Sequence, residues 1–386
     1  MGDDDPKGVA TLGFACLWDR DPRTTWSGTP WHLRAAIRRL GDGPAVVDAG
    51  LDVPSALRTA MRAVSARRSR GRWIARWEHW PVWRRAAERR IRARARREGC
   101  DAVLEIGDLA VVDRPYFVYQ DLSALLVAED RMRAGREEFF RLLDTPARVA
   151  RRIAWQRHVY GNATGVFAMS RWLADHLVEH EGIPRRAVHV VPPGATSLAG
   201  AGPLPARPAD APRRRLLFLG TEFRTKGGDQ VVAALRVLRR EVDPRITLTV
   251  AGPRSWPLPG APPAGVTFLG RVPRERVVSL IDAHDVFVMP SRMEGFGIAF
   301  VEALGRGVPC VGRRACAMPE IIDDGETGAL VEGDDPSDLA EIVARVLADD
   351  RVHAQARARA AEVAGFFTWD RAAADMVRAI EASSSG

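Results

Sequence analysis

Short apolar runs of strand length alternate with helical patterns along this chain, and the alternation occurs in two series. The first series places strands near residues 8–18, 44–48, 101–106, 116–119, 164–169 and 188–191. The second series places them near residues 214–220, 246–252, 266–270, 285–290, 308–312 and 328–331. Strands that alternate with helices form parallel βαβ units, whose sheets are covered on both faces. The predicted fold class is therefore α/β, with two Rossmann-like domains.

A segment without periodicity separates the two series. Residues 197–213 are rich in Ala, Pro, Gly and Arg, and they are predicted to be a linker. They divide an N-terminal domain, residues 1–196, from a second domain, residues 214–365. Residues 366–386 complete the chain with a helical pattern over Thr368–Ala382 and a short tail. A chain of 386 residues is long enough for two domains of ordinary size.

The composition narrows the class of protein. Hydrophobic residues make up 46% and charged residues 27% of the chain, as is typical of soluble globular proteins. No apolar run approaches the roughly 18 residues that a membrane-spanning helix needs. The acidic N-terminus does not resemble a secretory signal. The four cysteines are sparse and indicate a reducing compartment rather than a disulfide framework. These features predict a cytoplasmic protein.

The positive charge is concentrated in one segment. Fifteen arginines lie in Arg58–Arg97, with only three glutamates up to residue 98, so this segment carries +12 while the whole chain nets +8. Trp73, Trp77 and Trp80 recur in it at helical spacing. Such a helix face suits an anionic membrane, so peripheral membrane contact is one hypothesis. A helical pair that packs its tryptophans inward is the other, and nucleic acid is the least favoured partner.

The most informative stretch reads DVFVMPSRMEGFGIAFVEALGRG, a strand followed by a loop and a helix. Ligands of open α/β sheets bind beyond the carboxyl ends of the strands. The unpaired amides at the start of a helix favour an anion such as phosphate. Gly295 and Gly297 permit a tight turn and a close approach of a ligand to the backbone. Glu294 and Glu302 are eight residues apart, so we expect them to bind different parts of a polyhydroxylated ligand.

This stretch resembles the E-x7-E signature of the retaining glycosyltransferase family 4, and the resemblance extends over roughly residues 164–369. It implies the GT-B fold, in which two Rossmann-like domains face a central cleft and the last helix crosses back to the N-terminal domain. It also implies that Glu294 binds hydroxyls of the donor sugar and that Glu302 binds the ribose. The backbone of Phe296, Gly297 and Ile298 would then hold the sugar and the diphosphate.

A second strand–loop–helix stretch, LLFLGTEFRTKGGDQ, contains a lysine placed to neutralise a diphosphate. Members of the family use a lysine at the position that matches Lys226. Most also have an arginine directly after the strand glycine, where this chain has Thr221, so Arg224 is the replacement candidate. The neighbouring strand ends expected around the donor contribute Gly220, Gly252, Gly270, Arg271 and Val272.

The N-terminal domain offers weaker candidates. Gly28 and Thr29 follow the first strand, as the glycine-rich loop of the family does, and they would add amide donors near the phosphates. Asp121 ends a strand where family members often have a His or Asp near the donor sugar and the acceptor hydroxyl. No metal site is expected, because His176 and His180 share a helix face but lack a third ligand. No cofactor is expected either.

These observations predict a retaining glycosyltransferase that moves a hexose-type sugar from a nucleoside-diphosphate sugar, UDP or GDP, to an acceptor hydroxyl. Lys226, Arg224 and the helix start at Gly297 would stabilise the leaving diphosphate without a metal. The resemblance implies that the departing phosphate oxygen serves as the base. A sugar-nucleotide epimerase or a phosphorylase of the same fold is the alternative enzyme. A non-catalytic basic protein that binds membrane or RNA is the alternative from another class.

Overall fold

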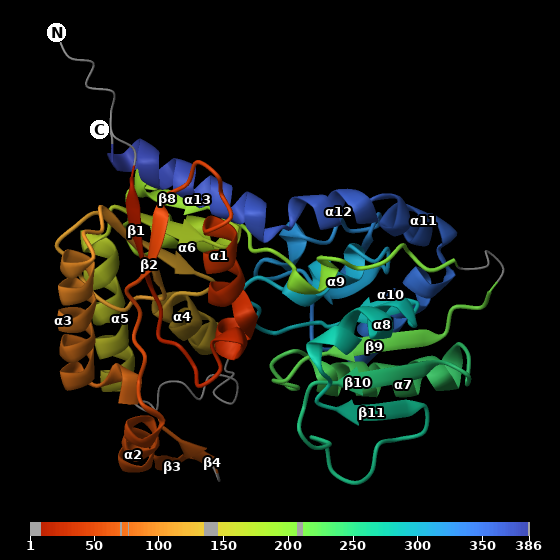
Figure 1. The fold of residues 1–386 in the computed structure, drawn as a ribbon. Helices are drawn as coiled ribbons and strands as arrows, with labels where there is room; N and C mark the ends of the chain where they lie inside the picture. Colours follow the sequence, from red (N-terminus) through yellow and green to blue (C-terminus); the bar gives the residue numbers. More distant parts are fainter. Residues whose placement is uncertain (1–8, 70–71, 76, 135–145, 207–210, 385–386) are drawn as a thin grey trace. The chain divides into compact units, whose positions relative to one another are not determined.

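A computed structural model describes residues 9–69, 72–75, 77–134, 146–206 and 211–384 of the chain. The chain divides into two compact units. Unit 1 comprises residues 1–194 and 369–386, and unit 2 comprises residues 195–368. Each unit contains one parallel six-stranded sheet with helices packed on it, as Figure 1 shows. Unit 2 is therefore inserted, in sequence, between the main part of unit 1 and its last helix.

The sheet of unit 1 has the strand order β2-β1-β5-β6-β7-β8, and every neighbouring pair is parallel. Its strands are β1 (Thr11–Ala15), β2 (Ala45–Asp48), β5 (Ala102–Ile106), β6 (Tyr116–Gln120), β7 (Gly165–Ala168) and β8 (Val188–Val190). Its helices are α1 (Thr29–Ile37), α3 (Pro81–Arg97), α4 (Ala124–Ala134), α5 (Pro146–Asn162), α6 (Arg171–Glu179) and α13 (Trp369–Ser384). Strands β5, β6 and β7 are buried along their whole length, because helices cover both faces of the sheet.

An insertion between β2 and α3 forms a small substructure that the strand pattern did not predict. It contains α2 (Ser55–Ser65), an antiparallel hairpin of β3 (Arg67–Ser69) and β4 (Arg72–Ile74), and a short 3-10 turn, η2 (Trp77–His79). Figure 1 shows these elements below the main sheet of unit 1.

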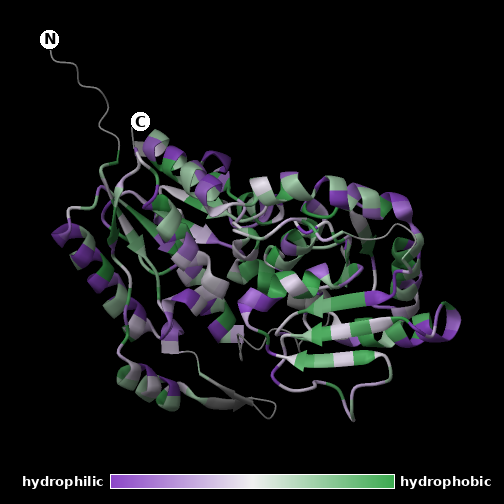
Figure 2. Ribbon diagram, turned by 45° about the vertical axis from the view of Figure 1, so that its right-hand side comes forward, coloured by the Kyte–Doolittle hydropathy of each residue, from purple (hydrophilic) through white to green (hydrophobic). Residues whose placement is uncertain are grey.

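The sheet of unit 2 has the strand order β11-β10-β9-β12-β13-β14, again all parallel. Its strands are β9 (Arg215–Leu219), β10 (Thr247–Ala251), β11 (Val266–Gly270), β12 (Val286–Val288), β13 (Cys310–Arg313) and β14 (Gly328–Val331). Its helices are α7 (Gly228–Glu241), α8 (Val277–Asp282), α9 (Ile298–Leu304), α10 (Pro336–Ala348), α11 (Asp350–Ala358) and α12 (Ala360–Phe366). Figure 2 shows these strands as mostly apolar and the helices as striped, the pattern of helices with one buried face.

The last helix, α13, packs on α1 of unit 1, as the sequence predicted. Arg39 and Asp370 form an ion pair of 2.6 Å, and the rings of His32 and Trp369 stack at 6.4 Å. A Cβ on Gly194 would lie 2.5 Å from the backbone nitrogen of Trp369, so only a glycine fits beside this helix start.

The segment predicted as a linker, residues 197–213, belongs to unit 2 over its described residues. Arg306 donates to the carbonyl oxygens of Gly202 and Pro203 at 2.6 and 3.0 Å. Arg357 donates to the carbonyl oxygen of Pro205 at 2.7 Å. The division into two units falls between Gly194 and Ala195, and the buried Arg306 and the half-buried Arg357 hold this segment on unit 2.

Candidate active site

The sheet order of unit 2 defines one point where ligands are expected. The connections from β9 to β10 and β11 run toward one edge of the sheet, and β12 lies on the other side of β9. The loops that follow β9 and β12 therefore leave the carboxyl edge side by side, which is the binding crevice of doubly wound sheets. The loop after β9 contains Lys226, and the loop after β12 contains Glu294.

The structure brings these two predicted residues into contact. The Nζ atom of Lys226 lies 2.7 Å from Oε2 of Glu294, and the hydroxyl of Ser291 lies 3.4 Å from the same oxygen. The side chain of Glu294 is 11% exposed and that of Lys226 is 22% exposed. The pair is thus largely shielded from water but reachable, so a ligand that arrives there meets an ammonium and a carboxylate held in fixed positions.

Lys226 also stands out in the composition. The chain contains 55 arginines and two lysines, Lys7 and Lys226, and Lys7 lies outside the described residues. The aliphatic part of Lys226 packs against Gly220, whose Cβ would lie 3.1 Å from Cγ of the lysine. An ammonium is a compact point charge on a slender stem, whereas a guanidinium is a wide planar fork. The narrow space beside Gly220 therefore suits a lysine at position 226, in a chain whose basic residues are almost all arginines.

A glycine sets the backbone beside this lysine. Gly227 precedes α7 with a φ of 76°, a left-handed conformation. A Cβ at this position would lie 2.4 Å from the carbonyl oxygen of Pro290, at the end of the β12 segment. Gly227 therefore lets the Lys226 loop and the Glu294 loop touch backbone to backbone.

Arg292 joins the same two loops and was missed by the sequence argument. Its backbone nitrogen donates to the carbonyl oxygen of Thr225 at 2.8 Å, and its Nη1 donates to that of Arg224 at 2.6 Å. Its guanidinium also pairs with Asp229 at 2.7 Å and Asp334 at 2.8 Å. Asp229 and Asp334 are far from Arg292 in the sequence, so no sequence pattern predicts that they pair with it.

The other predicted donor residues surround this pair or lie close to it in the fold. Gly297 has a φ of 105° and precedes the first residue of α9, Ile298. Phe296 is buried, and its ring lies 5.8 Å from that of Phe367. Oε1 of Glu302 accepts a hydrogen bond of 2.5 Å from the hydroxyl of Ser197, and burial raises the pKa of Glu302.

The ends of β9, β10 and β11 converge as expected. Gly252 has a φ of 123°, and its Cβ would lie 2.5 Å from the carbonyl oxygen of Gly220. Its amide donates to the carbonyl oxygen of Gly270 at 2.8 Å. Arg271 is exposed and Val272 half-buried directly after β11, and Arg224 is exposed on the loop after β9. It stays a prediction that the strand-end residues surround the nucleobase of the donor and that Arg224 binds its second phosphate.

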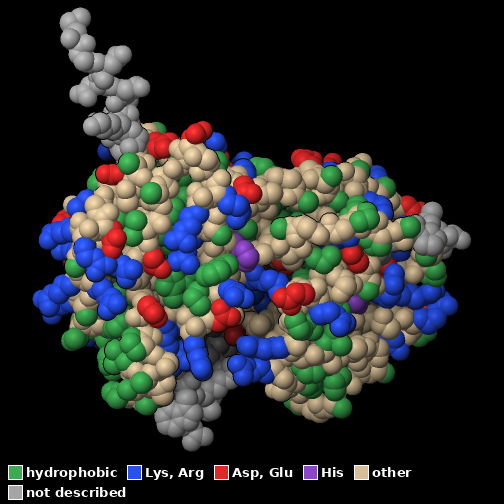
Figure 3. All heavy atoms as spheres, viewed as in Figure 1, with side chains coloured by type: hydrophobic (Ala, Val, Ile, Leu, Met, Phe, Trp, Pro, Cys, Tyr) green, Lys and Arg blue, Asp and Glu red, His purple; other side chains and the backbone are tan. Residues whose placement is uncertain are grey.

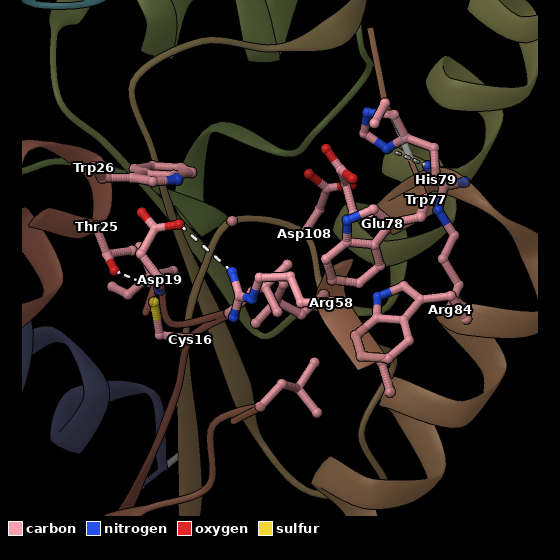
Figure 4. Close-up of a pocket in the computed structure, with 18 of the residues that line it drawn as sticks. Cys16, Asp19, Thr25, Trp26, Arg58, Trp77, Glu78, His79, Arg84 and Asp108 are labelled. Carbon is pink, nitrogen blue, oxygen red and sulfur yellow. Dashed lines mark hydrogen bonds and ion pairs between the residues drawn. The ribbon is translucent and has the colours of Figure 1, made fainter. Parts of the chain in front are cut away.

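Unit 1 has a pocket at the corresponding point of its own sheet. It lies at the carboxyl ends of β1 and β5, has a volume of about 400 Å³, and includes residues of the α2–η2 insertion and of α3. Figure 4 shows Asp19 and Trp26 on one side of this pocket and Trp77, Glu78 and His79 on the other. The loop that contributes Trp26 is strained, because Trp26 and Ser27 have φ values of 45° and 57°.

Of the predicted residues of unit 1, Gly28 follows this strained turn with a φ of 88°, and Thr29 is buried at the start of α1. Asp121 is half-buried directly after β6. Gly28, Thr29 and Asp121 are not among the residues that line the pocket. Asp108, which lines the pocket, was not singled out from the sequence.

The pocket is electropositive at its base. Arg152 forms a two-pronged ion pair with the buried carboxylate of Asp108, with one contact of 2.5 Å. The guanidinium of Arg84 lies over the ring of Trp155 at 5.0 Å. Burial, together with the charge of Arg152, lowers the pKa of Arg84 to about 10. Among the described residues, the pocket lining contains four arginines, Arg58, Arg62, Arg84 and Arg152, and three carboxylates, Asp19, Glu78 and Asp108, so the cations exceed the carboxylates by one.

Comparisons with known proteins agree with this geometry. Residues 206–363 match the family model described as "Glycosyl transferases group 1". Over these residues the chain is similar to this family. Among curated proteins it is similar to the D-inositol 3-phosphate glycosyltransferase of Xylanimonas cellulosilytica, 30% identical over 254 residues and 58% of each chain. It is also similar to that of Streptomyces avermitilis, 32% identical over 60% of this chain and 54% of the relative. The chain thus spans less than two thirds of these relatives.

Solved structures of similar fold cover nearly the whole chain. WaaG, a glycosyltransferase involved in lipopolysaccharide biosynthesis, matches with a TM-score of 0.64 at 18% identity, over 95% of this chain and 99% of WaaG. Anabaena HepE in complex with UDP-glucose matches with a TM-score of 0.62 at 16% identity, over 95% and 99%. The predicted GT-B fold is confirmed, and the match of residues 206–363 agrees with the predicted family.

The basic segment Arg58–Arg97 differs from the prediction of one helix with a tryptophan face. Trp73 lies in β4, Trp77 in η2 and Trp80 before α3, so they do not form one helical face. Trp77 is buried, with its ring 4.7 Å from that of Trp83 in an edge-to-face contact. The arginines remain outside: those exposed on α3 are Arg85, Arg89, Arg90, Arg96 and Arg97. Figure 3 shows Lys and Arg side chains gathered over this edge of unit 1. Within the described residues, no helix combines the length and apolarity that crossing a membrane requires.

The expectation that His176 and His180 lack a third residue of ligand type is wrong. The pair His176 and His180 does have a third residue of ligand type nearby, because Glu129 of α4 faces both rings. The sequence could not indicate it, since α4 and α6 are adjacent only in the folded unit.

Proposed function

We propose that this protein is a retaining glycosyltransferase that uses a nucleoside-diphosphate sugar, with a UDP-sugar as the favoured donor. The observation that supports this most is the Lys226–Glu294 pair at the switch point of a group 1 domain. Uracil is the favoured nucleobase of the donor because two proteins of similar fold have been solved with uridine nucleotides. One is HepE with UDP-glucose, and the other is the pneumococcal O-GlcNAc transferase GtfA with UDP and GlcNAc.

The chemistry assigned to each group follows from its charge and place. Lys226 neutralises the diphosphate as the bond to the anomeric carbon breaks, and the amides at the start of α9 add to this stabilisation. Glu294 accepts hydrogen bonds from sugar hydroxyls, and Glu302 from the ribose. Arg224 is the second phosphate cation. The acceptor hydroxyl attacks from the face that the diphosphate leaves, and a phosphate oxygen takes its proton.

A thermal-shift screen tests the donor assignment. UDP-, GDP- and ADP-sugars are added to the purified protein, and we expect a UDP-sugar to raise the unfolding midpoint most, because a ligand of the folded state stabilises it by mass action. Incubation with a labelled UDP-sugar but no acceptor then separates the enzyme classes. An epimerase would convert the label under these conditions, whereas a transferase requires the acceptor. A protein stabilised by none of the three sugars would contradict the proposal.

We place the acceptor in the pocket of unit 1 and propose that it is a hydroxyl compound with an anionic group. Arg84 and Arg152, which line the pocket, support the proposal that the acceptor carries a negative charge. The curated relatives act, by name, with D-inositol 3-phosphate, a polyol that bears a phosphate. The wall of tryptophans offers apolar faces against which a ring can lie.

Replacing Arg84 by methionine is expected to raise the KM for an anionic acceptor about 10-fold to 100-fold, because a charge-assisted hydrogen bond is lost. The KM for the donor should stay unchanged. Since the pKa of Arg84 is lowered to about 10, its contribution is complete well below that pH and disappears as the pH rises through it. The control is Arg85→Met, the exposed neighbour on α3, which does not line the pocket. If Arg84→Met and Arg85→Met had the same KM for the acceptor, Arg84 would not be part of the acceptor site.

Peripheral contact with an anionic membrane stays a proposal for the exposed arginines of α3. Co-sedimentation with vesicles that contain or lack anionic lipid distinguishes it from a purely structural role of this helix.

A further inference from the structure

Two histidines and two glutamates form a cluster between α4 and α6 of unit 1. His176 and His180 are four residues apart on one face of α6, and their rings stack with centroids 4.9 Å apart. On α4, Oε2 of Glu129 lies 3.9 Å from Nδ1 of His176, and its Oε1 lies 3.9 Å from Nδ1 of His180. One ligand atom from each of these three residues lies within 4.8 Å of those of the other two.

These separations suit a shared ion better than direct hydrogen bonds. A hydrogen bond between nitrogen and oxygen needs about 2.7–3.2 Å, so neither imidazole is bonded to Glu129 at 3.9 Å. Ligands around a tetrahedral Zn²⁺ lie about 3.4 Å apart, given metal–ligand distances near 2.1 Å. Small rotations of the side chains would bring the ligand atoms from their present separation of 3.9 Å to the separation of about 3.4 Å around a zinc ion. Two imidazoles four residues apart on a helix and a carboxylate from another element are a set that binds zinc.

A fourth residue occupies the position of an outer carboxylate. Oε1 of Glu181 lies 3.8 Å from Nε2 of His176, on the opposite side of the ring from Glu129, and its side chain is 1% exposed. Histidines that bind metals commonly present their second nitrogen to a carboxylate, which fixes the orientation of the ring. His176 therefore has one nitrogen toward the cluster and the other toward a buried acidic group.

We infer that Glu129, His176 and His180 bind a divalent ion of the zinc class, with the Glu181 carboxylate near the second ring nitrogen of His176. Three protein ligands leave the remaining position to water. The ion ties α4 to α6, two helices that follow neighbouring strands of the unit 1 sheet. The site lies in unit 1, whereas the Lys226–Glu294 pair lies in unit 2, and its test does not depend on the proposed transferase activity.

Metal binding is measured on the full chain, prepared without an affinity tag and treated with a chelator. Calorimetric titration with Zn²⁺ is expected to give a stoichiometry of about one ion per chain and a higher unfolding midpoint. Co²⁺ in place of Zn²⁺ is expected to give the intense visible bands of a tetrahedral site. A wild-type protein that shows no saturable uptake of either ion overturns the inference, and the cluster is then a set of ion pairs only.

Variants locate the ion. His180→Gln, at a partly exposed position, and Glu129→Gln are expected to reduce bound Zn²⁺ at least about 10-fold, since each removes one of three ligands. Glu179→Gln is the control, because this glutamate is exposed on α6 next to His180 but is outside the cluster. It should retain the full stoichiometry. Uptake that is equal in the wild type, His180→Gln and Glu129→Gln would mean adventitious surface binding and would overturn the site.

Discussion

Replacement of Lys226 by alanine is expected to lower kcat about 100-fold to 1,000-fold, the usual cost of removing one preorganised group that stabilises developing charge. The ammonium is the positive group that the structure holds 2.7 Å from Glu294 at the switch point of unit 2. Without it, the charge that grows on the leaving diphosphate has to be balanced by Arg224 and backbone amides alone. The measurement is single-turnover transfer from the UDP-sugar found in the screen.

Two further variants make this experiment decisive. Lys226→Arg should recover little activity, since the wider guanidinium does not fit beside Gly220. Arg236→Ala, at an exposed position on α7, should behave as the wild type and controls for loss of positive charge. Because Lys226 and Glu294 are in contact, the effects of Lys226→Ala and Glu294→Gln should not add in the double variant. A kcat near that of the wild type in Lys226→Ala would exclude this lysine from catalysis.

Gly227→Ala is expected to produce the largest loss of stability, about 3–5 kcal/mol in the free energy of unfolding of unit 2. Two costs combine at this position. An L-residue at a φ of 76° is strained, and the new Cβ would lie 2.4 Å from the carbonyl oxygen of Pro290, a backbone atom that cannot rotate away. Urea unfolding monitored by fluorescence measures the change, together with a fall in donor affinity because the two loops separate.

Substitutions at two other glycines of unit 2 separate the cost of backbone strain at Gly227 from the cost of the close approach to Pro290. Gly325 has a φ of 80° and no atom within 4 Å of its Cβ position, so Gly325→Ala measures the conformational strain alone, about 1–2 kcal/mol. Gly365 lies in α12, also without a neighbour, and Gly365→Ala should be neutral or stabilising by up to about 1 kcal/mol. If Gly227→Ala resembled Gly325→Ala, the close approach to Pro290 would be tolerated and the loop contact would be less rigid than described.

The sequence predicted the sheets because the strand runs are local signals. It indicated Lys226 and Glu294 because each lies in a loop between such a run and the next helix, in a stretch that resembles the family. It did not predict what depends on contacts between distant segments. Arg292 holds the two loops through Asp229 and Asp334, and Glu129 approaches His176 only after β6 and β7 pair. The tryptophan spacing in the basic segment indicated a helix that does not form there, because a hairpin and a short 3-10 turn interrupt it.

The placement of α13 in unit 1 determines the order in which the two units can be completed during synthesis. Every residue of unit 2 has been made once Thr368 is joined, whereas unit 1 still waits for the helix that packs on α1. A ribosome-bound chain halted just after that point, with enough extra length to clear the exit tunnel, would hold a finished inner unit inside an unfinished outer one. The α1 surface that α13 covers in the complete chain would be exposed during that interval.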